Sequence, residues 1–149
     1  HYSVHLRTPA TAATRADRPL LLEWWRAFAV EARDEPAPDA GQIARSVDHK
    51  LAESAGGIAL WEDGGRPVSA VAFGSPTPAG IRIGPVYTPP EARGRGYASA
   101  LTAHVSAQHL AAGRRFCFLY TNLANPTSNK IYVDIGYERV CDSVEYRFV

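Results

Sequence analysis

Residues 85–98 constrain the fold of this chain more than any other segment, because they predict a strand, a turn and a helix without interruption. The strand pattern is β-branched and ends at Pro89-Pro90. A basic, glycine-spaced turn follows, Arg93-Gly94-Arg95-Gly96, and an apolar helix pattern begins directly after it. The start of a helix presents unpartnered N–H groups and a partial positive charge, and glycine lets a phosphate approach them closely. The segment therefore predicts a site for a phosphate-bearing molecule.

Two other phosphate-binding motifs agree less well with this segment. Gly94-x-Gly96 begins like the GxGxxG of dinucleotide-binding folds, but Ser99 stands where the third glycine would be. The next strand pattern ends at Asn122 rather than at the carboxylate that a ribose needs. A P-loop would need a Gly-Lys-Ser/Thr sequence, which does not follow.

The patterns on both sides of this segment predict a single α+β domain over residues 1–149. The expected order is β-α-α-β-β-β-α-β-α-β(-β), in a mixed, mostly antiparallel sheet with a parallel crossover over 81–121. The expected strands are 2–7, 58–62, 67–74, 81–88, 115–121 and one or two within 137–149, and the expected helices are 19–33, 39–56, 96–112 and 125–136. Residues 8–18 are expected as a connector. The chain begins at His1 and contains no Met, so a longer polypeptide stays open.

Composition and charge restrict the class of function. The net charge is +1 and the hydrophobic content is 46%, which suit a soluble globular domain and give no overall field for nucleic acid or membrane. The arginine excess lacks a basic-aromatic stripe, which disfavours a nucleic-acid-binding module. Cys117 and Cys141 form no disulfide framework, and the five histidines show no metal-ligand spacing. A reducing cytoplasm, without metal or membrane partner, is the expected setting.

Two motifs carry a resemblance to the GNAT superfamily of N-acyltransferases. Arg93-x-x-Gly96-x-Ala98, after Pro90 and before a helix, resembles the acyl-CoA pyrophosphate loop of that superfamily. Asn125-Pro126-x-Ser128-Asn129-x-x-Tyr132-x-x-x-Gly136-Tyr137 resembles its next motif, and the order of both makes the resemblance specific. The resemblance implies a GNAT-like fold over nearly the whole chain. It also implies transfer of an acetyl group from acetyl-CoA to an amine acceptor, direct and in a ternary complex, since neither motif holds a cysteine.

The resemblance further implies how acetyl-CoA is bound around the first motif. Its pyrophosphate would lie across the N–H groups of residues 94–99, with Arg93 or Arg95 adding charge-assisted bonds. Pantetheine would enter a gap where the strand bulges near Gly84-Pro85, and a backbone N–H there can stabilise the tetrahedral oxyanion. A plain edge strand with a proline kink is the alternative. The implied cofactor-binding residues here are Val86, Tyr87, Thr88, Arg93, Gly94, Arg95, Gly96, Tyr97, Ala98 and Ser99.

Tyr132 is the candidate catalytic residue of the second motif. With Asn125 as helix cap, Ser128, Asn129 and Tyr132 are three or four residues apart and can share a helix face. By resemblance, Tyr132 protonates the departing CoA thiolate and also contacts the cofactor, which Asn125, Ser128 and Asn129 help to bind. A phenol with a pKa near ~10 can stabilise a thiolate with a pKa near ~8.5 by hydrogen bonding. The alternative is a tyrosine that only packs in the core.

The general base has no candidate on the central strand, because residues 81–88 contain no carboxylate. Glu31, Glu35, Asp142, Glu145, a water relay and a backbone acceptor all stay open. This absence supports the alternative function, a non-catalytic acyl-CoA-binding or sensing domain. The acceptor, a small-molecule or protein amine, is not specified, and a homodimer is open because dimers are common in the superfamily.

Trp24 and Trp25 are adjacent in the first expected helix. Neighbouring helical residues point in different directions, so we expect one of them in the core and the other partly exposed, or lining an acceptor pocket.

Overall fold

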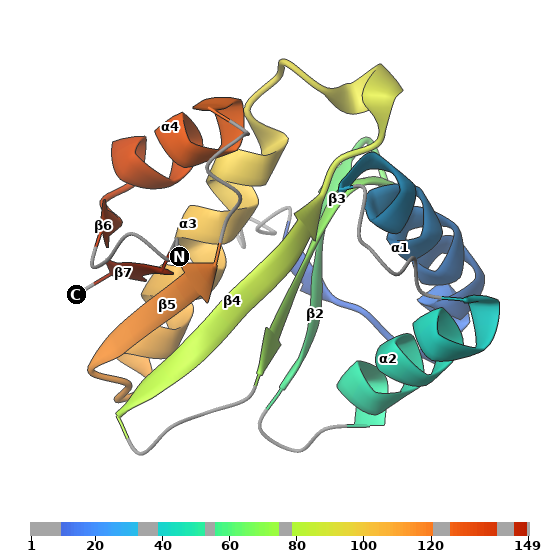
Figure 1. Ribbon diagram of the computed structural model, residues 1–149, viewed down its shortest axis with the longest axis horizontal. Coiled ribbons are helices and arrows are strands. Elements are labelled where there is room, and N and C mark those ends of the chain that lie inside the picture. Colours follow the sequence, from blue (N-terminus) through green and yellow to red (C-terminus); the bar gives the residue numbers. More distant parts are fainter. Residues whose placement is uncertain are drawn as a thin grey trace, which may run out of the picture.

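The computed structural model describes residues 10–32, 39–52, 56–74, 79–120, 126–139 and 145–148. The strands are β1 (Ala10–Ala12), β2 (Gly57–Asp63), β3 (Arg66–Gly74), β4 (Gly80–Tyr87), β5 (Phe116–Tyr120), β6 (Glu138–Arg139) and β7 (Glu145–Phe148). The helices are α1 (Arg18–Ala32), α2 (Ala40–Ala52), α3 (Tyr97–Ala111) and α4 (Pro126–Asp134), with short 3-10 helices η1 (Arg15–Asp17) and η2 (Pro90–Ala92). Figure 1 shows α1 and α2 on one side of the sheet and α3 on the other.

The sheet has seven described strands in the order β1-β2-β3-β4-β5-β7-β6. Every neighbouring pair is antiparallel except β4 and β5, which are parallel and are connected through α3. The predicted α+β class, the mixed sheet and the order of elements are therefore confirmed.

The two faces of the sheet carry separate hydrophobic clusters, as the alternation of side chains along a strand requires. In β2, Ile58 and Leu60 face the α1 and α2 side, while Ala59 belongs to the cluster on the α3 side. The buried members on the α1 and α2 side are Leu21, Trp24, Trp25, Ile43, Val47, Ile58, Leu60, Ala70, Ala72 and Tyr87. Those on the α3 side are Ala59, Val71, Ile81, Ile83, Leu101, Val105, Cys117, Leu119 and Tyr137.

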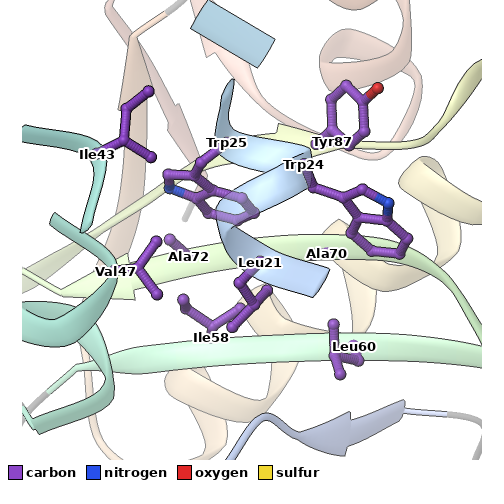
Figure 2. Packing of buried hydrophobic residues seen from close by; sticks show 10 residues of the cluster. All are labelled: Leu21, Trp24, Trp25, Ile43, Val47, Ile58, Leu60, Ala70, Ala72 and Tyr87. Atoms are coloured by element: carbon purple, nitrogen blue, oxygen red, sulfur yellow. The ribbon is translucent and has the colours of Figure 1, made fainter. Parts of the chain in front are cut away.

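Trp24 and Trp25 are both buried in the same cluster, so the expectation that one would be partly exposed is wrong. Each side chain is 6% exposed. Figure 2 shows Trp25 directed toward Ile43 of α2 and Trp24 directed toward Tyr87 of β4. Since α1 packs against α2 as well as the sheet, it buries an arc wide enough for two neighbouring positions.

Local sequence chemistry explains the structure at two places. The Asp39 carboxylate accepts from the Gln42 N–H at 2.8 Å, and the Gln42 amide oxygen accepts from the Asp39 N–H at 3.0 Å, so a capping box begins α2. Gly64 and Gly65 have φ of 60° and 80° and form the two-residue hairpin turn between β2 and β3.

The first strand lies elsewhere than predicted. The expected strand 2–7 falls outside the described residues, whereas β1 is formed by Ala10–Ala12, within the expected connector. This segment, Ala10-Thr11-Ala12, has three residues and no large apolar side chain, so it gives a weak strand pattern. It is extended because it pairs with Ala59–Trp61 of β2, and the Ala13 N–H also donates to the Ile58 carbonyl at 2.8 Å.

Candidate active site

β4 and β5 lie side by side only at their beginnings. Their parallel register joins Gly80–Arg82 to Phe116–Phe118 and stops there, although β4 continues to Tyr87. A Cβ on Gly80 would overlap the Phe116 ring, so glycine permits the close start. Figure 1 shows the two strands diverging toward the end at which α3 begins. Among the described strands, none pairs with this side of β4 beyond Arg82.

The divergence coincides with a bulge in β4. Val71 and Phe73 are two positions apart in β3, whereas their partners Val86 and Ile83 are three apart in β4. The extra residue belongs to the Gly84-Pro85 pair, where Gly84 has a φ of 121° that favours glycine. A bulge bends the strand and increases its twist, which separates the end of β4 from β5. The predicted bulge is confirmed, and a plain edge strand is wrong because β4 pairs on both sides.

The turn before α3 is open and rich in backbone donors. Residues 93–96 are exposed, and Gly94 and Gly96 have φ of 78° and 80°. No atom lies within 4 Å of a Cβ placed on either glycine. The Ala100 N–H makes the first intrahelical bond of α3, to the Gly96 carbonyl at 3.0 Å. The N–H groups before it have no acceptor within the helix, so an anion of phosphate size fits here.

The cationic side chains of the turn differ in their surroundings. Arg93 donates to both carboxylate oxygens of Glu31, at 2.6 and 2.8 Å, and its Nε donates to the Thr88 carbonyl at 2.9 Å. Arg95 is exposed and contacts no described residue through a hydrogen bond or an ion pair. Of the two arginines of the turn, Arg95 is therefore the one whose guanidinium has no partner among the described residues.

The remaining predicted residues of the first motif lie at the start of α3. Tyr97, Ala98 and Ser99 form its first turn and are partly buried. The Tyr97 hydroxyl hydrogen-bonds the Asp63 carboxylate at the end of β2. This contact ties the start of α3 to the β2–β3 hairpin, so the Tyr97 hydroxyl stabilises the fold.

The end of β4 is anchored to β3. The Ser69 side chain is fully buried, donates to the Tyr87 carbonyl at 3.1 Å and shares a hydrogen bond with the Thr88 hydroxyl at 2.9 Å. With Arg93 on the Thr88 carbonyl, the backbone after the bulge is held from two directions. Val86, Tyr87 and Thr88, the residues expected to contact pantetheine, thus belong to a fixed strand end.

Tyr132 lies in the last turn of α4 and packs against the cluster on the α3 side. A Schellman motif ends this helix: the Tyr137 N–H donates to the Tyr132 carbonyl at 2.9 Å and the Gly136 N–H to Val133 at 3.0 Å. The rings of Tyr132 and Tyr137 meet edge to face at 6.1 Å. Burial raises the pKa of the Tyr132 hydroxyl to about 12, so the hydroxyl is neutral and keeps its proton at physiological pH.

Three predicted residues of the second motif receive no side-chain description. Ser128 and Asn129 lie in α4, and Asn125 lies outside the described residues. Of the open base candidates, Glu35 and Asp142 also lie outside, and Glu145 is described only as part of β7.

Sequence reasoning missed the side chains that hold this site. Ser69, Asp63 and Tyr137 support the ends of β4, α3 and α4 through contacts between residues far apart in the sequence. Only Tyr137 had a local signal, since it follows the helix-ending Gly136.

Within the described part of the chain, no group of three His, Cys, Asp or Glu side chains is arranged to hold a metal. None of the described helices has the length and apolar character needed to span a bilayer.

Comparisons with known proteins agree with this geometry. A family model described as FR47-like protein matches residues 65–148, more than half of the chain. In a search of curated proteins, nothing matches.

Solved structures show the same fold at low identity. An N-acetyltransferase from Staphylococcus aureus Mu50 has a TM-score of 0.77 at 17% identity, covering 93% of this chain and 96% of that one. A ribosomal-protein-alanine N-acetyltransferase from Brucella melitensis has a TM-score of 0.76 at 18% identity, covering 94% and 98%. A GNAT superfamily phosphinothricin acetyltransferase from Sinorhizobium meliloti, in complex with acetyl-CoA, has a TM-score of 0.75 at 18% identity, covering 93% and 85%.

Proposed function

Since the chain belongs to the FR47-like family and has the fold of the N-acetyltransferases named above, we propose that it transfers an acetyl group from acetyl-CoA directly to an amine acceptor. The observation that carries the proposal is the combination of two features at one end of the sheet. The β4–β5 register stops at Arg82, and the glycine turn before α3 follows the same strand end.

The part of β4 beyond Arg82, which pairs with no described strand on the β5 side, supports the binding of a thin, extended ligand with hydrogen-bonding groups. Strand backbone that lacks a neighbour presents N–H and C=O groups in a row, and pantetheine carries two amides that can pair with such a row. The turn supports a diphosphate, because Gly94 and Gly96 leave the space of a Cβ empty beside the first N–H groups of α3. We assign pantetheine to the backbone of Val86–Thr88 and the diphosphate to residues 94–99 and Arg95.

The departing sulfur of CoA needs a proton, and we assign its donation to the Tyr132 hydroxyl. Acetyl-CoA supplies the acetyl group as an activated thioester. The amine nitrogen bonds to the acetyl carbon, the carbon–sulfur bond breaks, and the sulfur takes the proton of the Tyr132 hydroxyl, which solvent then restores. A hydroxyl with a pKa raised to about 12 is almost entirely protonated at neutral pH, as a general acid must be.

The amine must also lose a proton, and Glu31 is poorly placed to accept it. Both of its carboxylate oxygens accept hydrogen bonds from Arg93. We therefore route the amine proton to solvent rather than through Glu31.

The acceptor class is a primary or secondary amine. The similar proteins named above are described for an alanine of a ribosomal protein and for phosphinothricin, so this fold serves both protein and small-molecule acceptors. The fold alone selects neither.

The test is calorimetric titration of acetyl-CoA followed by transfer to a panel of amines, with the acetylated product detected by mass. We expect micromolar binding and a product with at least one amine. Binding without transfer to any amine would favour a non-catalytic acyl-CoA-binding domain. A folded protein that binds no acetyl-CoA would overturn the proposal.

A further inference from the structure

The guanidinium of Arg93 is engaged through Nε and Nη2, by groups at the end of β4 and of α1. It donates to both oxygens of Glu31, at 2.6 and 2.8 Å, and to the Thr88 carbonyl at 2.9 Å. Its central carbon lies 5.8 Å from the centre of the Tyr87 ring, within cation–π distance. All these partners belong to α1 or to the end of β4, and none belongs to the turn that Arg93 begins.

The groups that receive Arg93 are themselves fixed. Tyr87 is 5% exposed, and its ring centre lies 5.9 Å from that of Trp24 of α1. Both residues are labelled in Figure 2. The carbonyl of Tyr87 and the hydroxyl of Thr88 are both hydrogen-bonded to the side chain of the buried Ser69. Arg93 therefore joins two elements that already contact each other, and it does so one residue before the first flexible glycine of the turn.

The opposite end of α1 offers a matched comparison. Arg18 donates to both oxygens of Asp48 in α2, at 2.7 and 3.1 Å. The two pairs have similar exposure, with side chains 46% and 44% exposed for Arg93 and Glu31 and 37% and 39% for Arg18 and Asp48. Half-exposed pairs contribute little to global stability, so a special effect of the Arg93 pair must be local.

We propose that Arg93 and Glu31 form a brace that positions the turn before α3, residues 93–96, against α1. Arg93 is then a positioning residue rather than a phosphate ligand. The brace fixes where the turn begins, so that the N–H groups of residues 94–99 converge on one point. The phosphate contact from a side chain then falls to Arg95. This inference rests on the proposed function, because it concerns the turn assigned to acetyl-CoA.

Calorimetric titration of acetyl-CoA into single and double variants tests the brace. If it positions the turn, Glu31→Ala and Arg93→Met each raise the Kd by about 5- to 10-fold, and the double variant is no weaker than either single variant. If Arg93 instead leaves Glu31 to bind phosphate, Glu31→Ala must tighten binding, because it removes the competing carboxylate. Tightening, or an unchanged Kd in both single variants, would overturn the inference.

Two further variants separate positioning from charge and from general damage. Arg93→Lys keeps the charge but loses the fork that holds Glu31 and Thr88 together, so we expect it to bind as weakly as Arg93→Met. Recovery of wild-type affinity in Arg93→Lys would overturn the brace. Arg18→Met breaks the matched pair and should leave the Kd within twofold; an equal loss there would also overturn it. If wild type binds no acetyl-CoA, the proposed function fails first and the inference with it.

Discussion

The turn before α3 presents exposed backbone, whereas α4 presents a side chain packed into the core. Residues 93–96 are exposed, and the two glycines there leave N–H groups uncovered. Tyr132 is partly buried, and its surroundings rather than its identity raise its pKa to about 12. The proposed function therefore assigns binding and chemistry to different parts of the chain. The comparison teaches that the proposed binding would depend on the absence of side chains, and the proposed proton donation on how one side chain is enclosed.

The sharpest way to break the binding half is to place a negative charge in the turn. Gly96→Asp should weaken acetyl-CoA binding about 1,000-fold, equivalent to ~4 kcal/mol, because the carboxylate repels the diphosphate and caps the donors it needs. Calorimetry measures the change. Gly96→Asn has the same shape without the charge and tolerates a positive φ, so it should lose about tenfold at most.

A second control addresses backbone strain in the same helix. Gly113 follows α3 at its other end, has a φ of 106° and has no atom within 4 Å of a built Cβ. Gly113→Asp should leave the Kd unchanged. An equal loss of binding in Gly113→Asp would show that the fold, and not the turn, had been damaged.

The chemical half is broken by removing one hydroxyl. Tyr132→Phe should lower kcat about 100-fold, the lower end of the range for general acid catalysis, and leave the Kd for acetyl-CoA within twofold. Steady-state kinetics and calorimetry on the same preparation measure both. If kcat stays normal, Tyr132 only packs against the cluster on the α3 side.

The side-chain share of binding in the turn is expected to be smaller than the backbone share. Arg95→Ala should raise the Kd about tenfold, equivalent to ~1.4 kcal/mol, because one charge-assisted contact is lost. Its effect should shrink at high salt, since the contact is exposed. Arg45→Ala, at an exposed position in α2, is the control. If Arg95→Ala weakened binding as much as Gly96→Asp, the side chain rather than the backbone would make the larger contribution to binding.

The smallest effect concerns pH. The pKa of Tyr132 is raised above its usual value near ~10, so the neutral form is favoured in the folded state. The contribution of this protonated hydroxyl to the free energy of unfolding is present below pH ~10 and is lost as the pH rises toward 12. We therefore expect no alkaline loss of kcat from Tyr132 up to pH 10, less than a twofold change, measured as a pH–rate profile. A decline with a midpoint near pH 8 would contradict the assignment.

The sequence predicted what local backbone chemistry dictates. The turn at Gly94 and Gly96 and the bulge at Gly84-Pro85 could be predicted, because glycine frees φ and proline restricts it at its own position. The order of helices and strands was also predictable, because it depends on the spacing of apolar residues and on capping residues within each segment. The cofactor-binding roles implied for Asn125, Ser128 and Asn129 stay predictions.

What the sequence did not predict depends on contacts between distant residues. The pairing of Arg93 with Glu31 joins positions 62 residues apart, and no local pattern indicates it. β1 is a strand only because β2 offers it an edge. Trp24 and Trp25 are both buried because α1 meets α2 and the sheet together, which adjacent positions in one helix do not reveal.

The early end of the β4–β5 register has a consequence for self-association. Strand edges invite added strands from other chains, and proteins usually protect them with charge or proline at the rim of a sheet. Here the part of β4 that pairs with no described strand on this side lies inside the sheet, next to β5, which it meets at Gly80–Arg82 and from which it then diverges. A second protein chain would have to bring side chains on both faces between the two strands, whereas a narrow unbranched molecule would not. The geometry that we propose for ligand entry would therefore also disfavour misassembly.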